Sequence, residues 1–286
     1  MRPLRLELPP DRPRLSDANL RCISKLIQEE AGIVLSEEKS SLVMSRLGKR
    51  LNATRLANFD EYCRFVSSVA GAEERRNMLR ALTTNVTRFY REAHHFEDLQ
   101  NRVLPALQPQ MRRGLGLRIW SAACSSGEEP YSIALSLLGA LPDAAHHDVK
   151  ILATDIDTEM LQRARTGVYA RHSVSNIPDA LAAEHLEPAP DGPEGSWSVR
   201  SSLRKLISFK ELNLLRPWPM KGKFHAIFCR NVFIYFNRDT QEMITERFAQ
   251  VLHKGGTLYL GHSERMSGTL ASRFEYIGHS CYKLKY

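Results

Sequence analysis

Cysteine is scarce in this chain, and no cysteine pair has the spacing of a metal or redox motif. No C-x-x-C occurs, and the five cysteines are odd in number and far apart: Cys22, Cys63, Cys124, Cys229 and Cys281. This usage indicates neither a disulfide framework nor a zinc–cysteine site. We interpret the thiols as reduced and the chain as cytoplasmic.

Long apolar runs are missing as well. No stretch reaches the roughly 20 apolar residues that a membrane helix needs, and the first residues lack the apolar segment of a secretion signal. Apolar content is an ordinary 43%, and 286 residues suffice for one large domain or two smaller ones. Residues 1–15, rich in proline and arginine, are predicted to be a disordered arm.

The most informative segment is Leu117–Tyr131. It reads as an apolar strand, a loop of small residues and a helix that starts with two acids. A second apolar run follows and ends at Asp155. A strand, a small-residue turn, a helix and a second strand ending in a carboxylate make a nucleoside-binding βαβ unit, in which the carboxylate accepts hydrogen bonds from ribose hydroxyls.

The loop in this unit lacks the dinucleotide pattern G-x-G-x-x-G, because Gly127 is its only glycine. Glu128 and Glu129 stand where a pyrophosphate would otherwise meet the helix N-terminus, and two carboxylates repel phosphate. They suit a ligand with positive charge, such as S-adenosylmethionine, which has a sulfonium, an ammonium and no phosphate. An alternative is that the acids only favour the helix dipole; Asp155 and the spacing make that alternative weaker.

Helical periodicity dominates residues 16–82, which we predict to be an N-terminal helical domain. Ser16 is a plausible cap for the first helix, and Gly32 a plausible stop. Ser36 is predicted to cap the second helix, whose polar side is basic: Lys39, Arg46, Lys49 and Arg50. The net charge of +8 fits an acidic partner, but charge alone does not choose among nucleic acid, anionic lipid and an acidic protein surface.

Strands and helices alternate in the rest of the chain. Residues 83–116 are predicted to hold a linker and the first helix of the second domain, which continues over 117–286 with an inserted β-subdomain at 167–206. The strand candidates are Leu117–Ser121, Val149–Thr154, Ile207–Glu211, Phe224–Cys229, Thr257–Gly261 and Tyr276–Lys283. This order predicts an α/β fold with a Rossmann-like, mostly parallel sheet and an antiparallel end.

Three further polar stretches are candidates for chemistry. Asn85, Thr87 and Arg91 lie in a segment that joins the two domains, and spacing alone favours a plain polar linker there over a ligand site. Arg230 and Asn231 end a strand candidate and would face a ligand crevice. The remaining candidates are Tyr235, which could reach the reacting centre or pack in the core, and the pair Asn213-Leu214, which would flank an adenine ring.

Histidine occurs in two adjacent pairs, at 94–95 and 146–147, without a partner at i,i+4 spacing. We interpret them as surface or packing residues, and we predict no metal site.

Several long motifs occur in order along the chain and together resemble the CheR family of chemotaxis receptor methyltransferases, from about Ser16 to Tyr286. They are T-N-x-T-x-F-x-R at 84–91, R-E-A-H-H-F at 91–96, W-S-A-A-x-S-x-G-E-E-P-Y-S at 120–132, D-I-D-T-E at 155–159, F-x-A-I-F-C-R-N-V-x-I-Y-F at 224–236 and G-H-S-E at 261–264.

The resemblance implies an O-methyltransferase that uses S-adenosylmethionine, releases S-adenosylhomocysteine and acts on glutamate side chains of chemoreceptor cytoplasmic helices. It implies a cofactor site formed by Asn85, Thr87, Arg91, Glu129, Asp155, Asn213, Leu214, Arg230 and Asn231, with Arg91 and Tyr235 nearest the methyl group. It also implies that the basic helix with Lys39, Arg46, Lys49 and Arg50 faces the acidic receptor.

In some members of that family the β-subdomain binds the C-terminal peptide of the receptor through a G-x-G turn, and residues 188–195 here have a different glycine pattern. Two rival functions stay open. One is a methyltransferase acting on RNA, which the missing N-P-P-[YF] tetrapeptide disfavours; the other is a non-catalytic module that uses the same fold as a scaffold or sensor. We expect a monomer with no nucleic-acid partner and no membrane insertion.

Overall fold

The computed structural model describes residues 14–142, 144, 147–266 and 268–286. Most of the predicted arm at 1–15, and one histidine of the second pair, lie outside these ranges. The chain divides into two compact units between Thr84 and Asn85. In the described ranges, no helix is both long and apolar enough to cross a membrane.

The first unit is built of helices: α1 (Asp17–Ala31), the 3-10 turn η1 (Glu37–Lys39), α2 (Ser40–Thr54), α3 (Phe59–Ser67) and α4 (Ala72–Leu82). Ser16 caps α1 by accepting a hydrogen bond from the Asn19 backbone N–H, and the Asn19 side chain accepts from Ser16 in return. Gly32 ends α1 with a φ of 71°. Both predicted ends of the first helix are therefore confirmed.

The predicted cap of the second helix at Ser36 is wrong. The Lys39 N–H donates to the Ser36 carbonyl at 3.0 Å, which closes a 3-10 turn before the α-helix starts. Helix α2 begins at Ser40, and the Lys39 side chain makes no capping bond. Glu37 and Glu38, which directly follow Ser36, therefore belong to η1.

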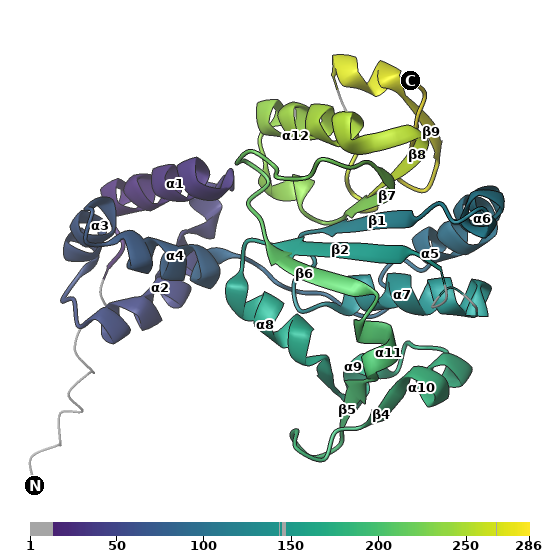
Figure 1. The fold of residues 1–286 in the computed structure, drawn as a ribbon. Coiled ribbons are helices and arrows are strands. Elements are labelled where there is room, and N and C mark those ends of the chain that lie inside the picture. The colour runs from purple at the N-terminus through teal and green to yellow at the C-terminus, as the bar shows by residue number, and fades with distance from the viewer. Residues whose placement is uncertain (1–13, 143, 145–146, 267) are drawn as a thin grey trace, which may run out of the picture. The chain divides into compact units, whose positions relative to one another are not determined.

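A seven-stranded sheet forms the centre of the second unit, with the order β6-β2-β1-β7-β8-β10-β9 (Figure 1). All pairings from β6 to β8 are parallel, and β10 pairs antiparallel with β8 and β9. The mostly parallel sheet with an antiparallel end is thus confirmed. The strands are β1 (Leu117–Ala122), β2 (Val149–Asp155), β6 (Ile207–Glu211), β7 (Phe224–Cys229), β8 (Leu252–Leu260), β9 (Phe274–Gly278) and β10 (Cys281–Leu284).

The strand predicted at Tyr276–Lys283 is wrong, because a hairpin turn divides it into β9 and β10. His279 and Ser280 form this turn with φ angles of 50° and 59°. Two successive residues at positive φ match the twist of the flanking strands. Neither residue is the glycine or asparagine by which such turns are usually recognised.

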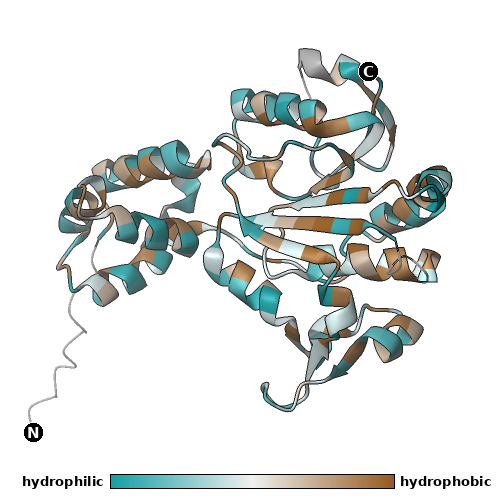
Figure 2. Ribbon diagram, viewed as in Figure 1, coloured by the Kyte–Doolittle hydropathy of each residue, from teal (hydrophilic) through white to brown (hydrophobic). Residues whose placement is uncertain are grey.

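Helices cover both faces of the sheet, as alternate residues of one strand show. Ile119 packs in the core on one side with helix α7, whereas Trp120 packs on the other with Phe248 of α12. The strands β1 and β2 carry brown segments between paler and teal ones in Figure 2, and most of their residues are buried. The helices are α5 (His94–Asp98), the π-helical turn η2 (Leu99–Val103), α6 (Leu104–Arg112), α7 (Glu128–Ala140), α8 (Thr158–Thr166) and α12 (Arg238–Val251).

A separate three-stranded antiparallel sheet occupies the region predicted as an insertion. Its order is β3-β5-β4, and it lies beside α7 and α8 with three short helices (Figure 1). Its elements are β3 (Val168–Ala170), α9 (Arg171–Val174), α10 (Asp179–His185), β4 (Leu186–Pro188), β5 (Ser196–Val199) and α11 (Ser201–Arg204).

Candidate functional site

Strands β2, β1 and β7 are parallel neighbours, so their carboxyl ends meet at one edge of the sheet. The crevice beyond this edge is where open α/β sheets bind ligands. Most predicted site residues lie in the loops that follow these strands or in the segment 85–92. The site can therefore be described within the second unit alone.

The loop between β1 and α7 has an unusual backbone. Ala123, Ser125 and Gly127 have φ angles of 67°, 49° and 99°. A Cβ at position 127 would lie 2.8 Å from Ala164 Cβ and 2.8 Å from the Tyr169 hydroxyl, so only glycine fits. Residues held in sparsely populated backbone conformations concentrate at ligand sites.

Asp155 ends β2 and joins two loops. Its Oδ2 accepts a hydrogen bond from the Ser125 N–H at 2.7 Å, and its Oδ1 accepts one from the Asp157 N–H at 2.8 Å. Burial raises the pKa of Asp155 to about 6, although these two N–H groups favour the ionised form. Each carboxylate oxygen keeps a lone pair that a ligand hydroxyl can use.

Asn85 binds the neighbouring loops rather than forming part of a helix. Its Nδ2 donates to Asp157 Oδ2 at 2.9 Å, and its carbonyl accepts from the Ser125 hydroxyl at 3.2 Å. The other oxygen of Asp157 caps α8 by accepting from the N–H groups of Glu159 and Met160. The segment that carries Asn85 is thus attached to the ends of both β1 and β2.

Arg230 is the centre of a buried ionic cluster, and it is only 6% exposed. Its guanidinium donates to Glu129 Oε2 at 3.0 Å, lies 3.3 Å from Glu92 Oε2 and donates to the Arg91 carbonyl. The second oxygen of Glu129 accepts from the Ser121 hydroxyl at 2.7 Å. The Nε of Arg230 is buried without a hydrogen-bond partner among the described residues.

The two carboxylates of this cluster respond differently to burial. Burial alone would raise the pKa of Glu92, but the Arg230 charge and hydrogen bonds from His262 and Asn231 outweigh it and lower that pKa to about 2. Burial raises the pKa of Glu129 despite the opposing effect of the Arg230 charge. Glu92 is therefore the firmly ionised partner of Arg230.

Glu264 fixes the loop that follows β7. This carboxylate is 3% exposed and accepts hydrogen bonds from the N–H groups of Gly261 at 2.6 Å, Asn231 at 2.9 Å and Ile234 at 3.3 Å. Asn231 has a φ of 60°, and its Nδ2 donates to Glu92 at 3.3 Å. The loop is held in this conformation by a buried acid from the G-H-S-E motif.

The other predicted site residues of the second unit occupy less constrained positions. Arg91 and Thr87 are partly exposed, and the Arg91 guanidinium donates to the Val86 carbonyl at 2.8 Å. Tyr235, also partly exposed, ends the 3-10 turn η4 (Phe233–Tyr235).

Asn213 and Leu214 follow β6. The Asn213 Oδ1 accepts from the Leu215 N–H at 2.9 Å, while Leu214 is buried in the core with α12. The structure places this pair at the carboxyl end of an outer strand.

The basic residues predicted to face a partner belong to the first unit, and two of them make internal contacts. Arg46 donates to the carbonyls of Leu82 and Thr83 at the end of α4, at 3.0 and 2.8 Å. Arg50 binds Glu74 through two hydrogen bonds of 2.9 and 2.6 Å. Lys49 is exposed and Lys39 partly exposed, so the basic surface is narrower than the helical pattern predicts.

Sequence reasoning missed the acids and hydroxyls that organise the site: Glu92, Ser121, Ser125, Asp157 and Glu264. All three acids stand inside motifs that were recognised: Glu92 in R-E-A-H-H-F, Asp157 in D-I-D-T-E and Glu264 in G-H-S-E. Motif membership was therefore a usable signal, but it did not identify the partner of each acid.

Comparisons with known proteins cover nearly the whole chain. Residues 85–282 match the family described as CheR methyltransferase, SAM binding domain, and residues 18–83 match CheR methyltransferase, all-alpha domain. A probable chemotaxis protein methyltransferase of Rhizobium etli is 48% identical over 90% of this chain and 96% of the relative. The chemotaxis protein methyltransferase of Escherichia coli is 41% identical over 96% of this chain and 93% of the relative.

Proposed function

Because the chain belongs to the CheR methyltransferase family, and is thus an S-adenosylmethionine-dependent methyltransferase of chemotaxis, we propose that it methylates glutamate side chains of chemoreceptor cytoplasmic helices. The products are glutamyl methyl esters and S-adenosylhomocysteine.

The observation that carries this proposal is the set of acids at the carboxyl edge of the sheet. Glu128, Glu129, Asp155 and Asp157 lie on two adjacent loops and helix starts, and three of the four are less than 10% exposed. Such a site repels phosphate and fits a ligand with ammonium and sulfonium charges. When bound, S-adenosylmethionine supplies a methyl group on a positively charged sulfur.

Individual roles follow from the contacts of each residue. We assign the remaining lone pairs of Asp155 to ribose hydroxyls, and Asn213 and Leu214 to the adenine ring. Asn85, Thr87 and Asn231 border the same crevice from the loops around it.

Arg230 acts in this proposal as a positioning residue. Its guanidinium is already bonded to Glu129, to Glu92 and to the Arg91 carbonyl. It therefore holds Glu129 toward the ligand and fixes the backbone of Arg91. Its contribution to cofactor binding is made through these partners.

The chain needs no strong general base for this reaction, because a glutamate substrate is already ionised near pH 7. Its task is to align the carboxylate oxygen with the methyl group and to exclude water. Arg91 has further N–H donors beyond the one that binds Val86, and we assign them to the substrate carboxylate or the cofactor. Tyr235 donates a hydrogen bond close to the transferred methyl group.

The receptor is proposed to meet the basic helix α2 of the first unit. Lys49 and Lys39 offer charge there, and Arg46 and Arg50 contribute a positive field although their guanidinium groups also hold α4. The three-stranded sheet β3-β5-β4 is a candidate for the C-terminal peptide of the receptor.

The deciding experiment incubates the full chain with methyl-labelled S-adenosylmethionine and a chemoreceptor cytoplasmic fragment. Label released as methanol by mild base would identify carboxyl methyl esters. The Asp155→Ala variant provides the matched control, because it should bind the cofactor poorly and transfer little label.

Two outcomes would contradict the proposal. Base-stable label on RNA, with binding that falls steeply with salt, would favour an RNA methyltransferase. Measured S-adenosylhomocysteine binding without transfer to any receptor in a panel would favour a non-catalytic module.

A further inference from the structure

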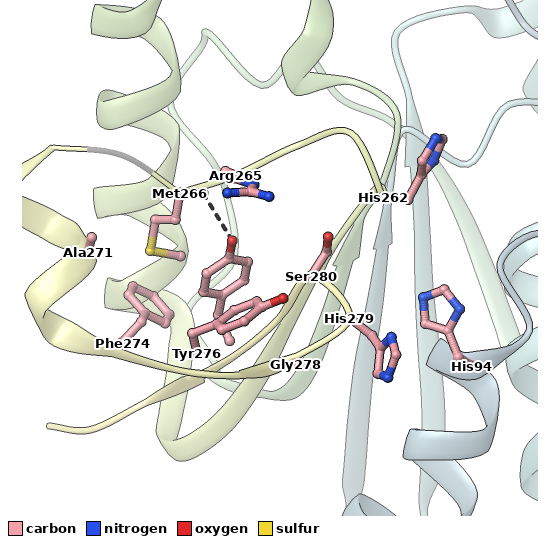
Figure 3. Close-up of a pocket in the computed structure, with 11 residues that line it drawn as sticks. His94, His262, Arg265, Met266, Ala271, Phe274, Tyr276, Gly278, His279 and Ser280 are labelled. Atoms are coloured by element: carbon pink, nitrogen blue, oxygen red, sulfur yellow. Dashed lines mark hydrogen bonds between the residues drawn. The ribbon is translucent and has the colours of Figure 1, made fainter.

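A pocket of about 720 Å³ opens beside the antiparallel end of the sheet (Figure 3). It lies between the loop after β8, the 3-10 turn η5 (Thr269–Arg273) and the hairpin of β9 and β10. Its apolar part contains Met266, Phe274 and Tyr282, and the Tyr282 hydroxyl accepts from the Met266 N–H at 3.3 Å. At its other end stand His94, His262 and His279, which Figure 3 shows near one another.

His94 also belongs to a cluster of possible metal ligands at this end of the pocket. One donor atom each of Glu92, His94 and His95 can be chosen so that all three lie within 4.8 Å of one another. The ring centroids of His94 and His95 are 4.3 Å apart, and that of His279 is 5.2 Å from His94. Glu92, His94 and His95 lie at the start of α5 or just before it, so the backbone holds them close together.

The buried His95 ring has a defined tautomer. Its Nε2 lies 2.7 Å from the His279 carbonyl oxygen, and a carbonyl only accepts, so Nε2 carries the proton. Nδ1 then presents a lone pair. His95 is 0% exposed, and Nδ1 has no hydrogen-bond partner among the described residues.

That lone pair faces another acceptor. Glu92 Oε2 lies 3.6 Å from His95 Nδ1, and a carboxylate held beside Arg230 has no proton to donate. Two acceptors at this separation repel each other unless a cation or a donor lies between them. Arg230 and the His262 N–H already satisfy Glu92 Oε2, so the His95 lone pair is the group left without a partner among the described residues, and a cation bound there would supply one.

We infer that Glu92, His94 and His95 form a binding site for a divalent transition-metal ion of the zinc class. Two imidazoles and one carboxylate are a zinc ligand set, and imidazole favours such ions over magnesium or calcium. The fourth position is left to a water molecule on the side of the pocket, which His94 and His262 line.

Two further features fit a metal site. The hydrogen bond from His95 Nε2 to a backbone carbonyl is the outer contact that orients metal-binding histidines. The pocket provides the entry path, since His94 and His262 line it. We interpreted the first histidine pair from the sequence as surface or packing residues. His95 does pack in the core, but in this inference it also presents a ligand atom.

The site is linked to the proposed methyl-transfer site through Glu92. Arg230 lies 3.3 Å from the same Glu92 oxygen and opposes a second cation there. A bound metal ion would therefore weaken the Glu92–Arg230 pair, and through it the positions of Glu129 and Arg91. Metal binding and cofactor binding should be coupled.

The test is a titration of the full chain, freed of metal by a chelator, with cobalt(II). Cobalt(II) in a site of imidazole and carboxylate ligands absorbs visible light, and zinc should displace it and remove the absorption. We expect saturation at one equivalent. This measurement does not depend on methyl transfer, so its failure would leave the proposed function standing.

The decisive variant is His94→Gln, because His94 is partly exposed and its loss should leave the fold intact. Loss of a ligand should weaken cobalt binding at least as much as loss of an outer contact does, about 10- to 100-fold. The matched control is His172→Gln, an exposed histidine on α9, which should bind cobalt as the unaltered chain does. Absence of saturable absorption, or equal affinity in the His94→Gln variant, would overturn the inference.

Discussion

Each of the two units pairs an arginine with at least one carboxylate that is largely shielded from solvent, but the two clusters differ in how completely their polar groups are hydrogen-bonded. In the first unit, Arg50 makes two hydrogen bonds to Glu74, which also accepts from the Tyr62 hydroxyl and from Asn77. All four residues lie in ordinary helices. In the second unit, the buried Nε of Arg230 has no hydrogen-bond partner within the part of the chain that the structure describes, and Glu92 and Asn231 beside it have positive φ angles.

The two clusters also differ in the backbone conformation of the residues near them. Around Arg230, the residues Tyr90, Glu92, Ala123, Ser125 and Asn231 all have positive φ, which side chains other than glycine rarely adopt. Strain and incomplete hydrogen bonding cost stability, and they persist where a ligand makes use of them. The comparison indicates that the Arg50 cluster supports the fold, and it supports our proposal that the Arg230 cluster belongs to a ligand site.

The strongest way to break this comparison is the Glu74→Ala variant. It leaves Arg50 and the Tyr62 hydroxyl without their shared partner, and we expect a loss of about 3 kcal/mol in the free energy of unfolding of the first unit. Hydrogen exchange of the α3 and α4 amides measures this loss. The neighbouring exposed Glu73→Ala should change it little, and unchanged protection in Glu74→Ala would contradict a structural role.

Asp155→Ala should act mainly on the ligand. We expect S-adenosylhomocysteine to bind about 1–3 kcal/mol more weakly, the cost of leaving ribose hydroxyls without an acceptor. Calorimetry on a variant shown to be folded by circular dichroism gives the value. The control is Asp148→Ala, which removes an exposed partner of Arg118; equal affinity in the two variants would refute the assignment of Asp155.

The pH dependence of binding sharpens the same contrast. Because burial raises the pKa of Asp155 to about 6, the carboxylate is mostly protonated at pH 5 and ionised at pH 7. Ribose hydroxyls donate better to the ionised form, so the affinity for S-adenosylhomocysteine should rise by up to about tenfold from pH 5 to 7. Asp155→Asn should remove this rise.

The raised pKa of Asp155 also bears on stability. Because the folded pKa of Asp155 exceeds its unfolded value, the contribution of Asp155 to the free energy of unfolding falls as the pH rises from about 4 to 6 and is level above that; the difference between the unaltered chain and Asp155→Asn isolates this contribution. Affinity and stability should therefore change in opposite directions over this range. Parallel changes would mean that another group controls the binding.

The smallest expected effect belongs to Tyr235→Phe. Because we propose that the Tyr235 hydroxyl lies near the transferred methyl, its removal should raise the activation free energy of turnover by about 0.5–1.5 kcal/mol, the worth of a single hydrogen bond. The affinity for S-adenosylhomocysteine should stay unchanged. Equal losses of turnover and of affinity would show that Tyr235 supports the structure instead.

Local signals explain most of what could be predicted about the fold. Ser16 and Gly32 carry their own capping chemistry, and the buried parallel strands read as short apolar runs. The turn between β9 and β10 was missed because histidine and serine occupy positions that usually demand glycine or asparagine. Its positive φ angles are imposed by strand pairing, which the sequence does not display.

The site was predictable as a set of loops but not as a set of contacts. Asp155, Glu129 and Arg230 could be placed at strand ends and helix starts from the alternation of elements. The partner of Arg230 could not, because Glu92 reaches it from a segment of irregular backbone 138 residues earlier in the chain, as the numbering shows. Likewise the sequence predicts Arg46 and Arg50 on a solvent-facing basic surface, whereas the structure shows both side chains bonded to α4 or its end.

The buried acid of the G-H-S-E motif also has a kinetic consequence. Glu264 binds the N–H groups of Asn231 and Ile234 in the loop after β7 and that of Gly261 just after β8, so the loop after β7 has little freedom left to lose. If this loop borders the cofactor, as we propose, binding should cost little conformational entropy there. The observed association rate should then rise linearly with cofactor concentration rather than level off, as it would if a slow loop closure limited it. We therefore expect this loop to act as a rigid template for the ligand rather than as a lid that closes over it.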